Sequence, residues 1–122
     1  KELVVSAGLG SPEDIAVDWL TLNVYFTDLK LRHIGVCENR GENCAVIVNA
    51  DIDKPRGITL VPVDRIMYWA DWGTHPMIAI SGMDGSNPRP FIQTEIHWPN
   101  DLTVDHFGSR LYWIDAKLKI IE

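Results

Sequence analysis

The chain has 122 residues, of which 46% are hydrophobic, and its formal net charge is -6. This length suits one small domain or part of a larger one, and the hydrophobic runs are too interrupted to span a membrane. The acidic balance argues against nucleic acid as a partner, because phosphate binding needs a basic surface. No signal peptide is recognisable at Lys1, so we expect a mature or excised segment.

A short motif recurs three times along the chain. Its copies are Val24–Asp28, Met67–Asp71 and Leu111–Asp115, and their tyrosines lie 43 and 44 residues apart. A proline precedes each tyrosine by 13 residues, without a gap in any copy. Two linked motifs held in register three times indicate an internal repeat. A period of about 40 residues with four short strands in each unit is typical of β-propeller blades.

In chain order, the pattern predicts an all-β fold of about three consecutive blades. Residues 1–10 are expected to form the outer strand of a preceding blade, centred on Leu3–Val5. Residues 11–53 form the first complete blade, with strands near 15–18, 24–27, 32–37 and 44–49. Residues 54–96 form the second, with strands near 57–61, 66–70, 77–81 and 89–93. Residues 97–122 begin a third blade, with strands near 102–105, 111–114 and 118–122.

The repeated residues of the motif are predicted to be structural. Its consecutive apolar positions favour a strand that is covered on both faces, as when blades stack side by side. An aspartate beside such a strand needs hydrogen bonds, and we expect it to accept backbone N–H groups at a blade junction. A catalytic role is the alternative, which one copy per blade disfavours. The structural set is Tyr25, Asp28, Tyr68, Trp69, Asp71, Tyr112, Trp113 and Asp115.

The two cysteines, Cys37 and Cys44, flank a polar turn that contains a glycine. Cysteines at the two feet of a hairpin can approach closely enough to form a disulfide, which would place the chain in an oxidising compartment. Two buried free thiols in a cytosolic protein are the alternative. No histidine or further cysteine stands at the spacing of a zinc site.

The order of strands assigns every loop to one of two rims. In a four-stranded antiparallel blade, the loop before strand 1 and the loop after strand 2 lie on the same side, here called the upper rim. Trp72 and Trp98 fall on this rim, where a large aromatic side chain is either a plug between blades or a contact residue. More than half of the basic residues lie at or beside it: Lys30, Arg32, Lys54, Arg56, Lys117 and Lys119. They form either a solvated edge or a surface for an acidic partner.

These motifs resemble the YWTD β-propeller of the LDL receptor family over essentially the whole chain. Longer matches are Tyr68–Thr74, Trp98–Asn100 and Arg110–Leu118. The resemblance implies a six-bladed propeller, of which this chain is about half. It also implies the ectodomain of a single-pass endocytic receptor, exposed to the extracellular space and the endosomal lumen.

The resemblance further implies the partners of the chain. These are cysteine-rich acidic modules of the same or another receptor, protein or lipoprotein ligands, and a folding chaperone. The membrane would be reached only through other parts of the protein. No cofactor is expected in this segment, although calcium is expected in neighbouring modules.

Some functional residues carry over from the lipoprotein receptors by position. The residues matching Trp72, Trp98 and Lys117 lie there on the face that receives acidic modules. Lys119 replaces a histidine of the lipoprotein receptor. His75 and His97 fall on the upper rim by strand order, and histidine gains charge in the pH range of the endosome. The predicted partner-binding set is therefore Trp72, His75, His97, Trp98, Lys117 and Lys119, and an ordinary surface or packing role is the alternative for the histidines.

Two other functions are compatible with a propeller. A matrix or adhesion module of the nidogen type would use the same rim for a different partner. A six-bladed hydrolase would need carboxylates and amides around a central metal ion. The matching inner positions are Glu13–Asp14, Arg56–Gly57 and Asn100–Asp101, and an arginine among them opposes a cation. We therefore expect no catalytic residue, no metal ligand and no enzymatic activity.

Overall fold

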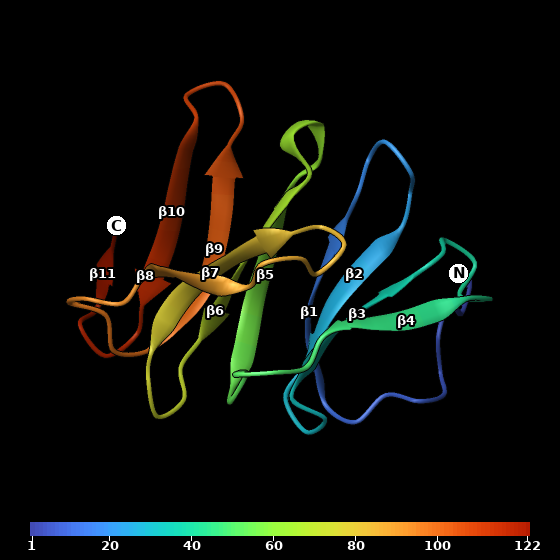
Figure 1. Cartoon of the computed structure of the whole chain (residues 1–122), viewed down its shortest axis with the longest axis horizontal. Coiled ribbons are helices and arrows are strands. Elements are labelled where there is room, and N and C mark those ends of the chain that lie inside the picture. The colour runs from blue at the N-terminus through green and yellow to red at the C-terminus, as the bar shows by residue number, and fades with distance from the viewer.

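A computed structural model describes all residues from Lys1 to Glu122. Its strands form three antiparallel sheets, side by side in chain order (Figure 1). The first sheet contains β1 (Pro12–Val17), β2 (Val24–Asp28), β3 (His33–Cys37) and β4 (Cys44–Val48). The second contains β5 (Pro55–Val61), β6 (Ile66–Asp71), β7 (Met77–Gly82) and β8 (Arg89–Ile92), with the 3-10 turn η1 (Pro62–Asp64) after β5. The third contains β9 (Pro99–Asp105), β10 (Arg110–Asp115) and β11 (Ile120–Ile121).

The prediction of an all-β partial propeller with about three blades is therefore confirmed. Each sheet is a meander, because consecutive strands are hydrogen-bonded neighbours throughout. The upper rim lies at the bottom of the view in Figure 1, where β2 leads into β3 and β6 leads into β7. No helix of sufficient length and hydrophobicity to cross a membrane is present.

The first strand of each sheet begins at its proline, two or three residues earlier than predicted. Pro12, Pro55 and Pro99 pair with the motif aspartates Asp28, Asp71 and Asp115, respectively. A register shift separates this pair from the regular ladder in every sheet. Such an irregularity tolerates a proline, which has no N–H to donate to the ladder. Strand β11 is shorter than predicted, because the turn after β10 extends to Lys119, whose φ is 59°.

No strand is present within residues 1–10, where the outer strand of a preceding blade was expected. A strand needs the backbone groups of a neighbouring strand, and no backbone–backbone hydrogen bond involves residues 1–9. Val5, Ala7 and Leu9 instead line a small cavity with Phe26 on the free face of the first sheet. Within residues 1–10, only the last few residues adopt the backbone conformation that recurs before the other two blades.

The backbone just before each proline shows this repetition directly. Gly8, Asp51 and Glu95 each stand four residues before the proline of a blade, and all have positive φ, at 78°, 57° and 53°. The left-handed conformation is uncommon for aspartate and glutamate. Its recurrence at the same repeat position shows that the chain enters every blade along the same path.

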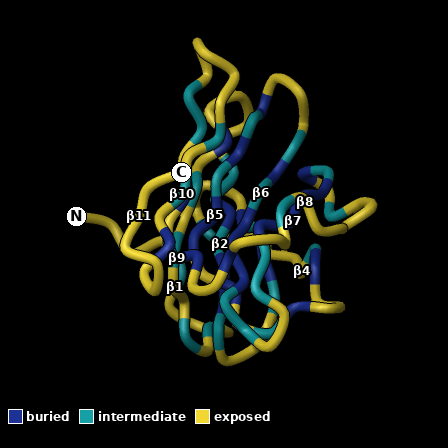
Figure 2. The backbone as a smooth tube through the Cα atoms, turned by 90° about the vertical axis from the view of Figure 1, so that its left-hand side faces the viewer, coloured by how far each residue is buried: buried dark blue, intermediate teal, exposed yellow.

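The core lies between the sheets. One cluster joins the first and second sheets and includes Tyr25, Ile34, Ile58, Met67 and Trp69. A second cluster joins the second and third sheets through Ala70, Ile78, Ile96 and Leu102. Exposed residues lie in the N-terminal segment, in the loops and along several strands, including β1, β4 and β10 (Figure 2).

The motif strand is covered on both faces only in the second sheet. Met67, Trp69 and Ala70 of β6 are all buried there. In β10 the matching strand is open on one face, where Tyr112 is 38% and Ile114 is 44% exposed. The predicted stacking of blades is thus visible where both neighbours are present.

Polar contacts fix one blade against the next. The Tyr25 hydroxyl donates to the Met83 carbonyl at 2.9 Å, and the Thr27 hydroxyl donates to the Arg56 carbonyl at 2.6 Å. Asp18 is fully buried and accepts a hydrogen bond from Arg65 at 2.8 Å. Burial would raise the pKa of Asp18, but the hydrogen bonds from Arg65, Leu20 and Thr21 outweigh burial and lower it.

Candidate partner-binding rim

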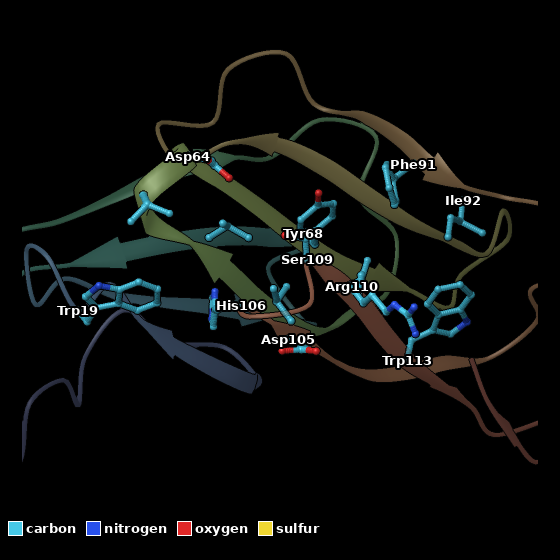
Figure 3. Close-up of a pocket in the computed structure, with 14 residues that line it drawn as sticks. Trp19, Asp64, Tyr68, Phe91, Ile92, Asp105, His106, Ser109, Arg110 and Trp113 are labelled. Atoms are coloured by element: carbon cyan, nitrogen blue, oxygen red, sulfur yellow. The ribbon is translucent and has the colours of Figure 1, made fainter.

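A cavity of about 610 Å³ lies between the second and third sheets. Figure 3 shows Tyr68 and Phe91 of the second sheet on one side and Trp113 of β10 near one end. Trp19 and His106 meet edge to face at the other end, with ring centroids 5.0 Å apart. The lining is mostly hydrophobic, as in the packing space between blades, and it lies away from the upper rim.

A second, polar cavity of about 250 Å³ is lined only by Glu13, Asp14, Arg56, Gly57, Asn100 and Asp101. These are the inner positions that a propeller hydrolase would use. The Asp14 carboxylate accepts a hydrogen bond from the Ile58 N–H at 3.0 Å, and the Asp101 carboxylate accepts one from the N–H of Leu102. No three His, Cys, Asp or Glu side chains of the chain are grouped so that they could hold a metal ion.

The upper rim is built on the motif aspartates. Asp71 ends β6 and is buried, with its two oxygens turned toward the backbone. It accepts the N–H groups of Asp53 at 2.9 Å, Lys54 at 3.0 Å and Gly73 at 2.9 Å. One side chain thereby joins the segment that enters the blade to the loop that leaves β6.

The other two motif aspartates make the same connection. Asp28 accepts the N–H groups of Gly10, Ser11 and Leu31. Asp115 accepts those of His97, Trp98, Lys117 and Leu118. The rim loops of all three blades are therefore fixed by a buried carboxylate rather than by side-chain packing alone.

For Asp28 and Asp115, these contacts decide how the carboxyl group responds to acid. Burial would raise the pKa of Asp28 and Asp115, but the backbone hydrogen bonds outweigh burial and hold both values below 3.8. A carboxyl with a lowered pKa contributes stability above its unfolded pKa and loses it as the pH falls through its folded pKa. That loss lies below about pH 4, so the rim stays assembled in mildly acidic solution.

The same backbone connections place basic residues over the two rim tryptophans. The Lys54 ammonium lies 4.5 Å from the centroid of the Trp72 ring, and the Arg56 guanidinium lies 5.9 Å from it. The Lys117 ammonium lies 5.6 Å from the centroid of the Trp98 ring. We call Trp72, Lys54 and Arg56 the Trp72 unit, and Trp98 with Lys117 the Trp98 unit.

The geometry gives each rim tryptophan its own basic partners. The cations over Trp72 are Lys54 and Arg56, and the cation over Trp98 is Lys117. Trp98 is 50% exposed, whereas Trp72 is only partly exposed. Sequence reasoning placed Lys54 on the rim without pairing it to a tryptophan. The repeat contains a signal for this pairing. Lys54 and Trp98 occupy the same repeat position, because each immediately precedes the proline of a blade.

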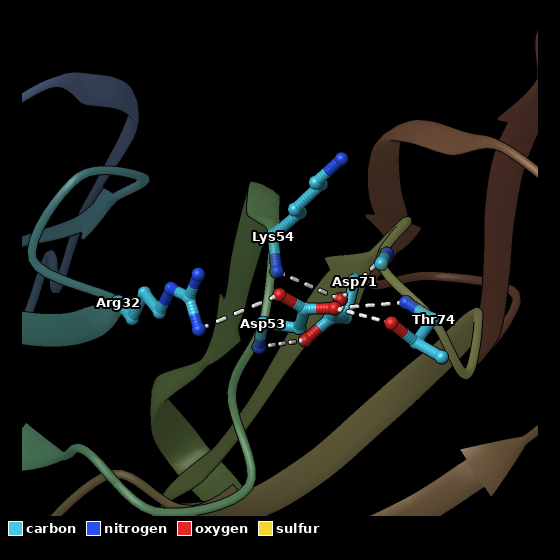
Figure 4. Close-up of polar contacts among 6 residues, drawn as sticks. Arg32, Asp53, Lys54, Asp71 and Thr74 are labelled. Carbon is cyan, nitrogen blue, oxygen red and sulfur yellow. Dashed lines mark hydrogen bonds and ion pairs between the residues drawn. The ribbon is translucent and has the colours of Figure 1, made fainter.

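Asp53 ties three rim segments together (Figure 4). Its carboxylate accepts the backbone N–H of Thr74 at 2.8 Å and the Thr74 hydroxyl at 3.1 Å, and it lies 3.9 Å from the Arg32 guanidinium. The hydrogen bonds from Thr74 lower the pKa of Asp53, and Arg32 and Lys54 add to this effect. The Lys54 side chain extends away from both Asp53 and Asp71 (Figure 4).

The remaining predicted contact residues are exposed on the same rim. His75 lies in the loop between β6 and β7, and His97 directly precedes Trp98. Lys119 lies in the turn between β10 and β11. His33 packs edge to face with Phe26 and His106 with Trp19, so neither of these histidines joins the rim tryptophans.

The predicted disulfide between Cys37 and Cys44 is present, at the end of the β3–β4 hairpin. The two residues are paired across the strands with their Cα atoms 4.1 Å apart. Replacing both by alanine should lower the free energy of unfolding by roughly 2–3 kcal/mol, because the bridge closes a short loop in the unfolded chain. Chemical denaturation of the oxidised protein and the variant measures this difference.

Asn43→Ala is the matched control for the hairpin, since it removes only an exposed hydrogen bond to Glu38. We expect it to change the stability by less than about 0.5 kcal/mol. Intact-mass analysis after alkylation without reductant should show no free thiol. Two modified cysteines under those conditions would contradict the bridge.

Comparison with known proteins agrees with the repeat and the fold. A family model described as low-density lipoprotein receptor repeat class B matches residues 65–106. The vitellogenin receptor of Solenopsis invicta is 49% identical over 121 residues, which are 99% of this chain and 7% of that protein. The vitellogenin receptor Yl of Drosophila melanogaster is 48% identical over 99% of this chain and 6% of its own length.

Two further similarities extend to smaller proteins and to a solved structure. The human low-density lipoprotein receptor-related protein 5-like protein is 34% identical over 99% of this chain and 48% of its own length. A chain in a crystal structure of a nidogen/laminin complex is 40% identical, with a TM-score of 0.90, over 93% of this chain and 43% of that one. The chain thus spans less than half the length of each of these proteins.

Repeat, fold and similarity together define a segment of a YWTD β-propeller. Its repeat and its fold are similar to those of the YWTD β-propellers of the LDL receptor family.

Proposed function

We propose that this chain is part of a ligand-binding and ligand-release propeller of an extracellular endocytic receptor, and that its upper rim binds an acidic partner. The observation that carries the proposal is the Trp98 unit. A lysine ammonium lies over a half-exposed tryptophan ring, and Lys117 belongs to neither of the two ion pairs of the chain. Lys117 can therefore accept a carboxylate from a partner, although the net charge of the chain is -6.

The chemistry of the Trp98 unit suits an acidic protein module. A carboxylate that reaches Lys117 forms a charge-assisted hydrogen bond, while the indole of Trp98 offers apolar area of the kind that dominates binding energy. Cysteine-rich, calcium-binding acidic modules of the same or another receptor match this surface. The disulfide supports an extracellular or endosomal location, and the role is binding rather than catalysis.

Trp98→Ala should weaken binding of a calcium-loaded, acidic cysteine-rich module by about 2 kcal/mol, roughly thirtyfold, as expected for a central aromatic contact. Lys117→Ala should have a similar effect, because it removes the ammonium from its carboxylate partner. Titration calorimetry on protein that contains the complete propeller measures both changes.

The repeat supplies matched controls for both variants. Lys30 follows Asp28 at the same distance as Lys117 follows Asp115, but Ser11 stands where Trp98 would be. Trp19 is 49% exposed, on the opposite rim. Lys30→Ala and Trp19→Ala should therefore bind like the parent. Equal binding by Trp98→Ala, Lys117→Ala and the parent would show that the rim is not the binding surface.

Binding should tighten as the pH falls from 7.4 to 5.5, since protonation of His75 and His97 adds positive charge on the rim that faces the acidic partner. The lowered pKa values of Asp28 and Asp115 keep both carboxylates ionised over this range, so loss of their rim contacts does not produce the response. The measurement compares the affinity at the two pH values for the parent and for His75→Ala/His97→Ala. A full pH response in the double variant would place the switch outside these residues, and His33→Ala/His106→Ala is the control pair.

The second candidate is a matrix or adhesion propeller, which the 40% identity to a chain of the nidogen/laminin complex favours. Both candidates bind proteins, but their partners differ in chemistry. Binding to a calcium-loaded acidic module that is lost on chelation of calcium supports the receptor. Calcium-independent binding to laminin, without binding to the acidic module, supports the matrix propeller.

A further inference from the structure

The Trp72 unit carries two cations, Lys54 and Arg56, and neither forms an ion pair with an acidic side chain of the chain. Lys54 and Arg56 lie on either side of one residue, Pro55, and both reach the Trp72 ring. The two ion pairs of the chain are Arg32–Asp53 and Arg65–Asp18, so neither cation of this unit takes part in one. Two like charges held close together repel each other, and an exposed cation–π contact offsets only about 0.5–1 kcal/mol.

The backbone holds this unit in place before any partner arrives. The Trp72 N–H donates to the Lys54 carbonyl at 3.1 Å, and the Lys54 N–H donates to Asp71 at 3.0 Å. The loop after Trp72 is fixed in turn by the contact between Thr74 and Asp53. A preorganised pair of cations loses little conformational entropy when it binds an anion.

The two cations offer different chemistry to a carboxylate. Arg56 supplies a planar fork that binds a carboxylate through two parallel hydrogen bonds, whereas Lys54 supplies a compact point charge. Arg56 also lines the polar cavity with Glu13, Asp14 and Asp101. Those carboxylates disfavour an acidic group deep in the cavity and so direct an incoming one toward the outer, Lys54 side of the ring.

The Trp72 and Trp98 units share no residue. Trp72 follows the last residue of β6 and depends on Asp71, whereas Trp98 precedes β9 and depends on Asp115. Each has its own aromatic face and its own cation, and they stand at successive blade junctions. They are therefore separate sites for negative charge.

We infer that the Trp72 unit is a second carboxylate-binding subsite, and that the acidic partner of the rim carries two separate acidic clusters, one for each tryptophan unit. This inference rests on the proposed function. Lys54 and Arg56 are then the residues that distinguish a partner with two clusters from a partner with one, because two linked contacts raise affinity through effective concentration.

The test uses two synthetic peptides as probes and protein that contains the complete propeller. One peptide carries a single Asp-Glu-Asp cluster, and the other carries two such clusters joined by Gly-Ser linkers of increasing length. At the best linker length, the parent should bind the two-cluster peptide at least tenfold more tightly than the one-cluster peptide. Lys54→Gln/Arg56→Gln should abolish this advantage while it changes binding of the one-cluster peptide by no more than about twofold.

The glutamine substitutions keep most of each aliphatic stem and remove the charges, and an unchanged melting temperature verifies folding. Lys30→Ala should keep the full advantage. If Lys54→Gln/Arg56→Gln keeps it while Lys117→Ala weakens both peptides, the second subsite is refuted and the proposed function stands. If the parent binds neither these peptides nor the calcium-loaded module, the proposed function fails, and the inference fails with it.

Discussion

Asp71→Ala is expected to lower the free energy of unfolding of the propeller by about 3 kcal/mol or more. The reason is that three backbone donors, on Asp53, Lys54 and Gly73, lose their acceptor at once. An unpaired buried donor costs about 1–3 kcal/mol. Thermal and chemical denaturation of protein that contains the complete propeller measures the loss.

Asp71→Asn keeps the shape of the side chain but replaces one acceptor oxygen by a donor, so it tests the contribution of the hydrogen bonds alone. Oδ1 of Asp71 accepts from Lys54 and Gly73, whereas Oδ2 accepts only from Asp53. An asparagine can keep the Oδ1 contacts but turns an NH₂ group toward the Asp53 N–H, so an intermediate loss of stability is expected. Asp64→Ala, at an exposed position in η1, should be nearly neutral. Wild-type stability of Asp71→Ala would show that the motif aspartates do not hold the blades together.

Residues 1–122 produced alone are expected to self-associate rather than to remain monomeric. One outer face exposes Ile15 by 62% and Val17 by 48%, although the matching Ile58 and Leu60 of the second sheet are each only 4% exposed. The opposite face exposes Ile114 by 44%, whereas its counterpart Ala70 is fully buried. Burying a large aliphatic side chain stabilises by about 1.5–3 kcal/mol, which drives such faces together.

Size-exclusion chromatography with light scattering tests this expectation over a range of concentrations. Ile15→Lys/Ile114→Lys should reduce the association of residues 1–122, because it places a charge on each open face. The same pair of substitutions should destabilise a complete propeller, where both positions are covered by neighbouring blades. A concentration-independent 13.8 kDa species with one sharp melting transition would contradict the prediction.

The amino-acid sequence by itself determined the repeat and therefore the fold. The constant spacing from proline to tyrosine and the period of the motif give the number and order of the strands, since each blade has to meet the next in the same way. Local patterns also located the disulfide, because both cysteines lie at the feet of one short hairpin. The backbone contacts of Asp28, Asp71 and Asp115 follow the same logic, as a buried carboxylate at a repeated position needs a repeated set of donors.

Tertiary structure alone decided which rim side chains meet. Lys54 and Trp72 are 18 residues apart in sequence, and they come together because Asp71 hydrogen-bonds to the backbone on both sides of the junction. The sequence pattern placed Trp72, Lys54 and Lys117 on one rim but did not show which lysine lies over which ring, since a pattern gives rim position and not the direction of a long side chain. Whether residues 1–10 form a strand also depends on residues outside this segment. A strand forms only beside a partner strand, and Leu3–Val5 have none in this structure.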